Sequence, residues 1–245
     1  MIETNRIYNG DCLEIMKSWP DASVDMIFTD PPYGNKNLDG DLASSRVGVK
    51  GGRQKAAVAI KNDSVEDTAR VLRGLFIEAA RILKPTGVIC CMTGGGGPGI
   101  SFAHFMIEMD AHLSFFQAII WDKSARGNGM GWRYRRNYEF VLVGFKKGGK
   151  LAWADDSVAV PNIVQTPPVA NEDHPTQKPV DLMASFIRWH TQPGDIVVDP
   201  FCGSGSTLIA AERMGRKWIG VELDEAFYPV ARERMDAELS QGKLL

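Results

Sequence analysis

The sequence is short of cysteine, of long apolar runs and of any surplus of one charge. Its four cysteines form no CxxC pair, and no histidine pair has the spacing of zinc ligands, so we predict neither a disulfide framework nor a bound metal. No apolar run approaches the roughly 18 residues of a membrane helix, and no secretory signal is visible, so we expect a cytoplasmic protein without a membrane partner. Lys and Arg number 28 against 30 Asp and Glu, a net charge of −2 that excludes a strongly basic nucleic-acid coat but not a local basic groove.

Short apolar runs that alternate with helical patterns predict an α/β fold. The runs typical of buried strands are 24–30, 87–92, 116–121, 140–145, 195–199 and 217–222. Helical periodicity covers 67–83, 101–110, 180–190, 206–214 and 226–239. This alternation predicts a doubly wound sheet, and because 116–121 and 138–145 follow each other with no helix between them, we expect an antiparallel pair there.

Two stretches interrupt this pattern. The length suits one large domain or two small ones, and we treat 1–245 as a single catalytic domain with two insertions. Residues 34–64 are rich in glycine and basic side chains, which predicts a long mobile loop of the kind that often serves function. Residues 146–173 are polar and contain proline, which predicts a small hairpin or irregular arm.

The first motif that could carry chemistry is Asp30-Pro31-Pro32-Tyr33, at the carboxyl end of the strand predicted over 24–30. Ligands bind at this end of the strands in an open α/β sheet. The prolines fix the backbone, and the turn then offers a carboxylate, outward carbonyls and an aromatic ring. That set suits a planar group that bears an amino group, while an ordinary proline-rich turn is the simpler alternative.

The second motif runs from Asp199 to Thr207, between a predicted strand and a predicted helix. Gly203 and Gly205 allow close backbone approach, and Ser206 or Thr207 could cap the helix. Glu222 lies 17 residues after Gly205, at the end of the next predicted strand. A glycine turn followed by an acid at about 20 residues is typical of a nucleoside site, where the acid binds ribose hydroxyls.

The third motif, His174-Pro175-Thr176-Gln177-Lys178-Pro179, directly precedes a predicted helix. Thr176 could cap that helix, and Lys178 could meet a ligand carboxylate near its start. Taken alone, the motif favours a capped helix start without any ligand.

Together the three motifs resemble those of the S-adenosylmethionine-dependent amino-group DNA methyltransferases. The tetrapeptide comes first and the glycine turn last, which is the permuted β-group order, and the segments 9–13 and 136–139 also match. The resemblance covers about residues 6–239. It implies a Rossmann-like, doubly wound, mostly parallel sheet of seven strands with one antiparallel strand, in which 7–11 lies beside 217–222.

The resemblance also implies catalytic roles. Asp30 and the Pro31 carbonyl would accept hydrogen bonds from the target amino group within the turn that Pro32 stiffens, and Tyr33 would stack on the base. The base would have to leave the duplex first, since methyltransferases are base-flipping enzymes.

For the cofactor, the resemblance assigns Glu222 to the ribose hydroxyls and Asp11 with the Cys12 backbone to the adenine edge. Thr176 and Lys178 would face the methionine carboxylate. The other expected contacts are Asp30, Asp199, Pro200, Phe201, Gly203, Ser204, Gly205, Ser206, Thr207 and Leu223. Phe201 is as well explained as a core residue, and Cys12 and Cys202 fit better as small fillers than as nucleophiles.

Two basic stretches are candidates for contact with DNA. Residues 123–136 hold five cationic side chains and two aromatic ones but no acid, and 46–61 is the second candidate. Interleaved basic and aromatic residues suit phosphates and an extruded base, whereas a solvated loop is the alternative. The expected DNA contacts are Arg46, Lys50, Arg53, Lys55, Lys123, Arg126, Arg133, Arg135 and Arg136.

The sequence therefore predicts a DNA methyltransferase that acts on N6 of adenine. Asp30 at the head of the tetrapeptide favours adenine, because the cytosine-N4 enzymes that the chain resembles more often have Ser there. Cytosine N4 is the nearest alternative, followed by a non-catalytic module that binds nucleic acid or cofactor, and by methylation of RNA or a protein amide. Members of the family often dimerise, so a homodimer is a further expectation from the resemblance.

Overall fold

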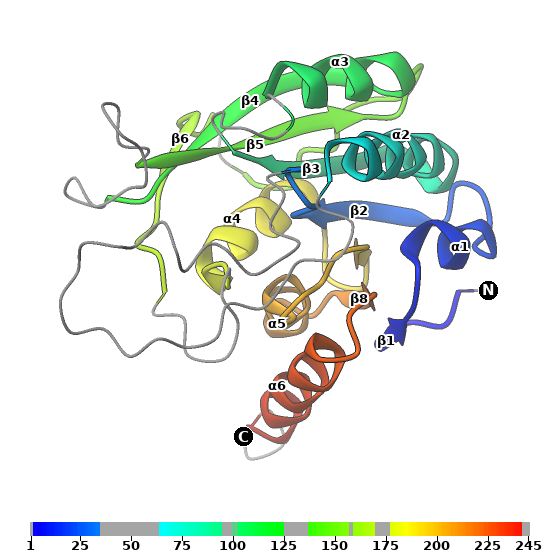
Figure 1. The fold of residues 1–245 in the computed structure, drawn as a ribbon. Helices are drawn as coiled ribbons and strands as arrows, with labels where there is room; N and C mark the ends of the chain where they lie inside the picture. Colours follow the sequence, from blue (N-terminus) through cyan, green and yellow to red (C-terminus); the bar gives the residue numbers. More distant parts are fainter. Residues whose placement is uncertain are drawn as a thin grey trace, which may run out of the picture.

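The computed structural model describes residues 2–34, 64–94, 100, 102–124, 137–156, 159–169 and 177–241. Across them, strands and helices alternate as the sequence patterns predict (Figure 1). The strands are β1 (Arg6–Asn9), β2 (Val24–Thr29), β3 (Leu83–Thr93), β4 (Ser114–Asp122), β5 (Tyr138–Phe145), β6 (Ile163–Gln165), β7 (Ile196–Asp199) and β8 (Lys217–Glu222). The helices are α1 (Cys12–Lys17), α2 (Val65–Ile82), α3 (Phe102–His112), α4 (Val180–His190), α5 (Ser206–Arg213) and α6 (Phe227–Gln241).

The strands form one mixed sheet in the order β1-β8-β7-β2-β3-β5-β4-β6. Strand β5 runs antiparallel to both of its neighbours, β3 and β4, and the other described pairs are parallel. The predicted mostly parallel sheet with one antiparallel strand is therefore confirmed. So is the predicted contact between the two ends of the chain, because Tyr8 of β1 pairs with Val221 of β8.

The sheet has eight described strands and not the seven that the resemblance implies. The additional strand is β6, which lies in the predicted arm 146–173 and pairs with β4. Only three residues long, β6 is mostly exposed and carries no apolar run that a sequence pattern could reveal.

Helices cover both faces of the sheet (Figure 1). Residues of α1, α2 and α3 pack into one buried apolar cluster, and residues of α4, α5 and α6 pack into the other. Alternate side chains of β3 enter opposite clusters: Cys90 lies with the α4–α6 layer and Cys91 with the α1–α3 layer. All four cysteines are buried and free.

Local sequence explains where the elements begin and end. The Ser64 side chain caps α2 by accepting a hydrogen bond of 3.0 Å from the Asp67 N–H. Helix α2 ends at Ile82, shortly before the Lys84-Pro85 pair, because a proline disfavours helical backbone in the residue that precedes it. In the described part of the chain, none of the helices is long and apolar enough to cross a membrane.

Two predictions concern segments whose placement is not described. The predicted mobile loop 34–64 lies outside the described residues except at Gly34 and Ser64. The basic stretch 123–136 is described only at Lys123 and Ser124. That 1–245 is a single domain also stays a prediction.

Candidate functional site at the carboxyl edge of the sheet

The candidate site lies where the winding of the sheet changes direction. From β2 the chain moves outward to β3, whereas from the adjacent β7 it moves the other way to β8. The carboxyl ends of strands at such a switch point are where ligands bind in doubly wound folds. Asp30 follows β2, Asp199 ends β7 and Glu222 ends β8, so the topology brings three of the predicted acids to one edge.

The tetrapeptide 30–33 is held rigidly at the end of β2. The Tyr33 hydroxyl donates a hydrogen bond to Asp30 Oδ1, and the Ile100 N–H donates one of 2.8 Å to the Tyr33 carbonyl. The Tyr33 ring packs closely over Gly94, where an added Cβ would lie 3.3 Å from ring atom Cδ2. Burial, followed by the charges of Asp30 and Glu139, raises the pKa of Tyr33 well above its usual value, so its hydroxyl stays a donor.

The second oxygen of Asp30 is occupied by Lys178, which precedes α4. Lys178 Nζ contacts Asp30 Oδ2, and the same ammonium group lies 3.7 Å from Glu139 Oε2. The structure thus brings Lys178 together with the catalytic candidate Asp30, 148 residues away in sequence. Its predicted contact with the carboxylate of a cofactor stays a prediction.

Glu139 is a site residue that the sequence predictions missed. It belongs to a segment that matches the family pattern, but no role follows from that match. An acid inside the apolar strand β5 is the signal that could have identified it, because a buried carboxylate requires partners. Lys178 and Lys123 lower the pKa of Glu139 against the effect of burial, so its carboxylate is charged.

The glycine turn 199–207 contacts the end of β8 through Glu222. The Gly203 N–H donates a 2.9 Å hydrogen bond to Glu222 Oε2, and the Asp224 N–H donates one of 2.7 Å to Oε1. Each oxygen keeps a second lone pair for a ligand hydroxyl. Gly205, with φ at +81°, is the N-cap of α5, a left-handed conformation that favours glycine.

Asp199 is the most deeply buried of these acids. Its Oδ1 accepts hydrogen bonds of 3.0 Å from Thr29 Oγ1 and 3.1 Å from the Phe201 N–H, which joins β2 to the turn. Burial raises the pKa of Asp199 to about 7, although these hydrogen bonds and one from Thr207 oppose the rise.

The residues at the β1–α1 junction have structural roles of their own. Asp11 caps α1 by accepting a 2.9 Å hydrogen bond from the Leu13 N–H. Cys12 is buried, and burial raises the pKa of its thiol, as it does for Cys202. Both thiols are therefore poor nucleophiles, which agrees with their interpretation as small fillers. Phe201 is half-buried and packs against the core on the α1–α3 side.

The remaining predicted contacts are only partly described. Pro200 and Ser204 are buried within the turn, and Leu223 is half-buried after β8. Thr176 lies outside the described residues, as do all the predicted DNA contacts except Lys123. Lys123 Nζ lies 2.5 Å from Glu139 Oε1 and 4.9 Å from the centre of the Trp121 ring.

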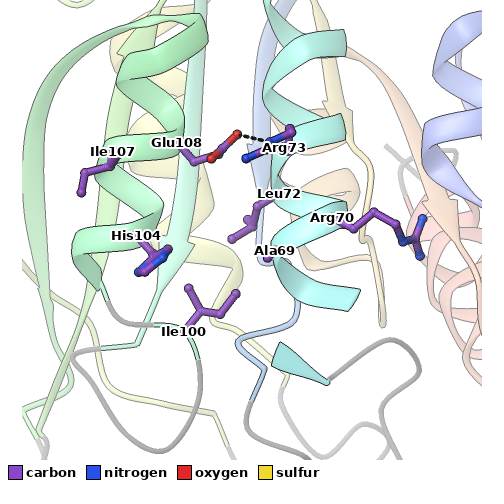
Figure 2. A pocket seen from close by; sticks show the side chains of 8 residues that line it. All are labelled: Ala69, Arg70, Leu72, Arg73, Ile100, His104, Ile107 and Glu108. Atoms are coloured by element: carbon purple, nitrogen blue, oxygen red, sulfur yellow. Dashed lines mark hydrogen bonds and ion pairs between the residues drawn. The ribbon is translucent and has the colours of Figure 1, made fainter. Parts of the chain in front are cut away.

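Two other features of the described residues bear on the site. They contain no group of three or more His, Cys, Asp or Glu side chains that could hold a metal ion. A separate pocket of about 500 Å³ lies between α2 and α3, and a 3.0 Å ion pair joins Arg73 to Glu108 beside it (Figure 2). Its lining contains none of the acids of the carboxyl edge, so we do not assign the chemistry of the site to it.

Comparison with known proteins agrees with the geometry of this edge. A family model described as DNA methylase, for the N6 and N4 enzymes, matches residues 24–233. The type II methyltransferase M2.DpnII of Streptococcus pneumoniae is 27% identical over 255 residues, which cover 95% of this chain and 90% of the relative.

Solved structures of DNA methyltransferases also resemble this protein. TTHA0409 of Thermus thermophilus, crystallised with S-adenosyl-L-methionine, superposes with a TM-score of 0.63 at 25% identity, and the match covers 95% of each chain. The cytosine-N4-specific PvuII DNA methyltransferase shares the fold, with a TM-score of 0.71 at 22% identity over 95% of this chain and 86% of its own. Because the family model spans most of the sequence, the chain belongs to the N6/N4 DNA methylase family.

Proposed function

We propose that this chain methylates N6 of adenine in DNA, with S-adenosyl-L-methionine as the methyl donor and with the target base flipped out of the duplex. The observation that carries the proposal is the tetrapeptide 30–33 at the switch point of the sheet, where a carboxylate and an aromatic ring lie side by side. Aspartate at position 30 favours adenine, since the cytosine-N4 enzymes that the chain resembles more often have serine there.

The residues of the edge fit S-adenosyl-L-methionine. Glu222 is oriented by two backbone N–H groups and keeps acceptor capacity for ribose hydroxyls. Ser206 Oγ is buried at the start of α5 with no hydrogen-bond partner among the described residues, so it can serve a ligand. When bound, this cofactor supplies an electrophilic methyl group.

The chemistry of the protein is then positioning and electrostatic stabilisation. Asp30 and the Pro31 carbonyl accept hydrogen bonds from the two N–H groups of the target amine, which orients the nitrogen lone pair towards the methyl group. Positive charge develops on that nitrogen as it is alkylated, and the Asp30 carboxylate stabilises it. No covalent enzyme intermediate is required, in agreement with the inert, buried cysteines.

Binding of the base depends on Tyr33. Its ring is fixed from behind by Gly94 and edge-on by Phe105, with ring centres 6.1 Å apart. A fixed ring provides a stacking surface for an extruded base without loss of side-chain freedom on binding. The cationic residues predicted in 123–136 and 46–61 would hold the phosphates on either side.

The test is transfer of a labelled methyl group from S-adenosyl-L-methionine to unmethylated DNA, followed by digestion to nucleosides. We expect the label in N6-methyladenosine. Label in N4-methylcytosine would replace adenine by cytosine as the target, and binding of the cofactor in calorimetry without any transfer would favour a non-catalytic module. Label in an RNA or protein control would overturn DNA as the substrate.

A further inference from the structure

Four charged side chains form a continuous chain of contacts at the carboxyl edge. Asp30 contacts Lys178, Lys178 lies 3.7 Å from Glu139 Oε2, and Lys123 lies 2.5 Å from Glu139 Oε1. The exposed fractions of Lys178 and Glu139 are 12% and 16%, so both central members are shielded from water. Two cations and two carboxylates alternate, so the formal charges of these four side chains sum to zero.

The carboxylate oxygens of Asp30 and Glu139 differ in how many hydrogen-bond donors they receive. Both oxygens of Asp30 are occupied, Oδ1 by the Tyr33 hydroxyl and Oδ2 by Lys178. Glu139 Oε1 receives Lys123, but Glu139 Oε2 is buried and has no hydrogen-bond partner among the described residues. Burying a carboxylate oxygen without a hydrogen-bond donor costs free energy. Glu139 Oε2 is therefore an acceptor that can take a donor from a neighbouring group.

We propose that Lys178 is a positioning residue with two binding positions: it holds Asp30 until the target amino group arrives, and it then moves to Glu139 Oε2. The inference deepens the proposed function and rests on it. The displacement is small, because a change of about 1 Å converts a 3.7 Å contact into an ordinary hydrogen bond. The flexible stem and compact ammonium group of lysine suit such a movement better than the planar fork of arginine.

Electrostatics explains why both positions are needed. Before the amine binds, Lys178 keeps the Asp30 carboxylate paired and in place. During methyl transfer the amine nitrogen becomes positive, and an ammonium group in contact with the same Asp30 oxygen would oppose that charge. Glu139 receives the displaced ammonium group, so that Lys178 does not become an unpaired buried cation.

The pKa shifts agree with this arrangement. Burial by itself lowers the pKa of Lys178, but the carboxylates of Asp30 and Glu139 outweigh it and raise the pKa above the usual value. The ammonium group therefore stays charged, and its movement transfers a full positive charge between the two acids.

The proposal differs from direct contact between Lys178 and the methionine carboxylate of the cofactor. In the two-position account, Glu139→Gln and Lys178→Met slow the chemical step and leave the affinity for S-adenosyl-L-methionine nearly unchanged. Direct contact with the cofactor predicts the reverse pattern for Lys178→Met and no effect of Glu139→Gln.

The experiment measures kcat and KM on unmethylated phage λ DNA, and the Kd of S-adenosyl-L-methionine by calorimetry. We expect both variants to lose at least about 10-fold in kcat while Kd changes less than about 3-fold. Lys178→Arg should recover only part of the loss, because a planar guanidinium fits the two acceptors less well. Glu238→Gln is the matched control, since Glu238 also pairs with a cation, at 2.7 Å from Arg213, but on α6.

Three results would overturn the proposal. One is an unchanged kcat in Glu139→Gln; another is a Kd weakened more than about 10-fold in Lys178→Met with kcat retained. The third is a loss of kcat that is accompanied in both variants by a lowered melting temperature, which would indicate a structural role only. A wild-type protein that transfers no methyl group to DNA would instead overturn the proposed function, and this inference with it.

Discussion

Asp30 has the two properties that an acceptor for an amino group requires. Its carboxylate is fixed by Tyr33 and Lys178 on separate oxygens, and the exposed fraction of its side chain, 23%, leaves it open to a ligand. In the proposed movement, Lys178 leaves Asp30 Oδ2 to the target amine while Tyr33 keeps Oδ1 in place. An acceptor held in fixed geometry is what electrostatic catalysis depends on.

Replacing Asp30 by alanine should therefore abolish most of the activity. We expect methyl transfer from labelled S-adenosyl-L-methionine to fall by at least about 100-fold, because a preorganised group opposite developing charge is removed. Asp21→Ala is the control, since Asp21 is 76% exposed and pairs with Arg81 away from this edge. Activity of Asp30→Ala within a few-fold of that of the control would contradict the assigned role.

The buried carboxyl group of Asp199 predicts how the stability of the protein depends on pH. Its pKa in the folded protein, raised to about 7 by burial, lies above the ordinary value of 3.8 that applies when the chain is unfolded. Between these values the folded state holds a proton that the unfolded state has lost, so this group makes wild-type stability fall as pH rises towards 7. Asp199→Asn lacks this titration.

The measurement is denaturant unfolding of the wild type and Asp199→Asn at pH 5 and pH 8. The difference in unfolding free energy should move in favour of the variant by up to about 3 kcal/mol between these two pH values. Other titrating groups are present in both proteins and cancel in the difference. A difference independent of pH, or one that moves in favour of the wild type, would contradict the assignment.

Sequence alone identified Asp30, Tyr33, Gly203, Gly205 and Glu222 as site candidates because their motifs are local. It could not place Lys178 on Asp30, since that contact joins residues 148 positions apart through the packing of α4 beside β2. Glu139 was missed for the same reason: its importance comes from two lysines that reach it from other elements. Long-range pairing of charges is a property of the fold, so it produces no motif of fixed residue spacing in the sequence.

At the scale of elements, the glycine turn and the helix it starts determine how the cofactor edge is shaped. Gly205 at φ +81° begins α5, and Gly194 at φ +89° precedes β7 at the opposite end of that strand. A Cβ at Gly194 meets nothing within 4 Å, and one at Gly205 meets only ordinary contacts with Ala231. Alanine at either position would therefore be strained by a similar positive φ, with little steric clash.

Gly205→Ala and Gly194→Ala should each lower the free energy of unfolding by about 1 kcal/mol. Only Gly205→Ala should also weaken the binding of S-adenosyl-L-methionine in calorimetry, because only that strain lies in the turn at the site. Equal cofactor affinity in the two variants would argue against a role of this turn in binding.

The elements were predictable to the extent that their apolar patterns are long. Helix α4 was predicted at its observed bounds, and β8 likewise, because α4 carries a periodic buried pattern and β8 a continuous one. The six-residue helix α1 was not predicted, since it is too short for a periodic pattern and depends on the Asp11 cap and on contacts with α2. The short strand β6 depends in the same way on β4.

At the scale of the whole molecule, a net charge of −2 has to be reconciled with a polyanionic substrate. The acids Asp30, Asp199 and Glu222 gather at the carboxyl edge, whereas the stretch 123–136 holds five cationic side chains and no acid. Binding of DNA by such a basic stretch of sequence would release counterions and be sensitive to salt.

The triple variant Arg133→Ala, Arg135→Ala, Arg136→Ala should weaken DNA binding and reduce its salt dependence. We expect the slope of log K against log salt, measured by fluorescence anisotropy, to become less negative by roughly 3 if each arginine contacts one phosphate. Arg213→Ala is the control, because Arg213 pairs with Glu238 on α6. An unchanged slope in the triple variant would place the DNA contacts elsewhere.

We expect a protein of this family, with aspartate at the head of its tetrapeptide, to modify adenine in DNA. The most direct measurement is sequencing, with detection of modified bases, of DNA from cells that express the wild type or Asp30→Ala. We predict N6-methyladenine at a recurrent sequence in cells with the wild type and none at that sequence with Asp30→Ala. N4-methylcytosine in its place, or the same adenine methylation with Asp30→Ala, would contradict it.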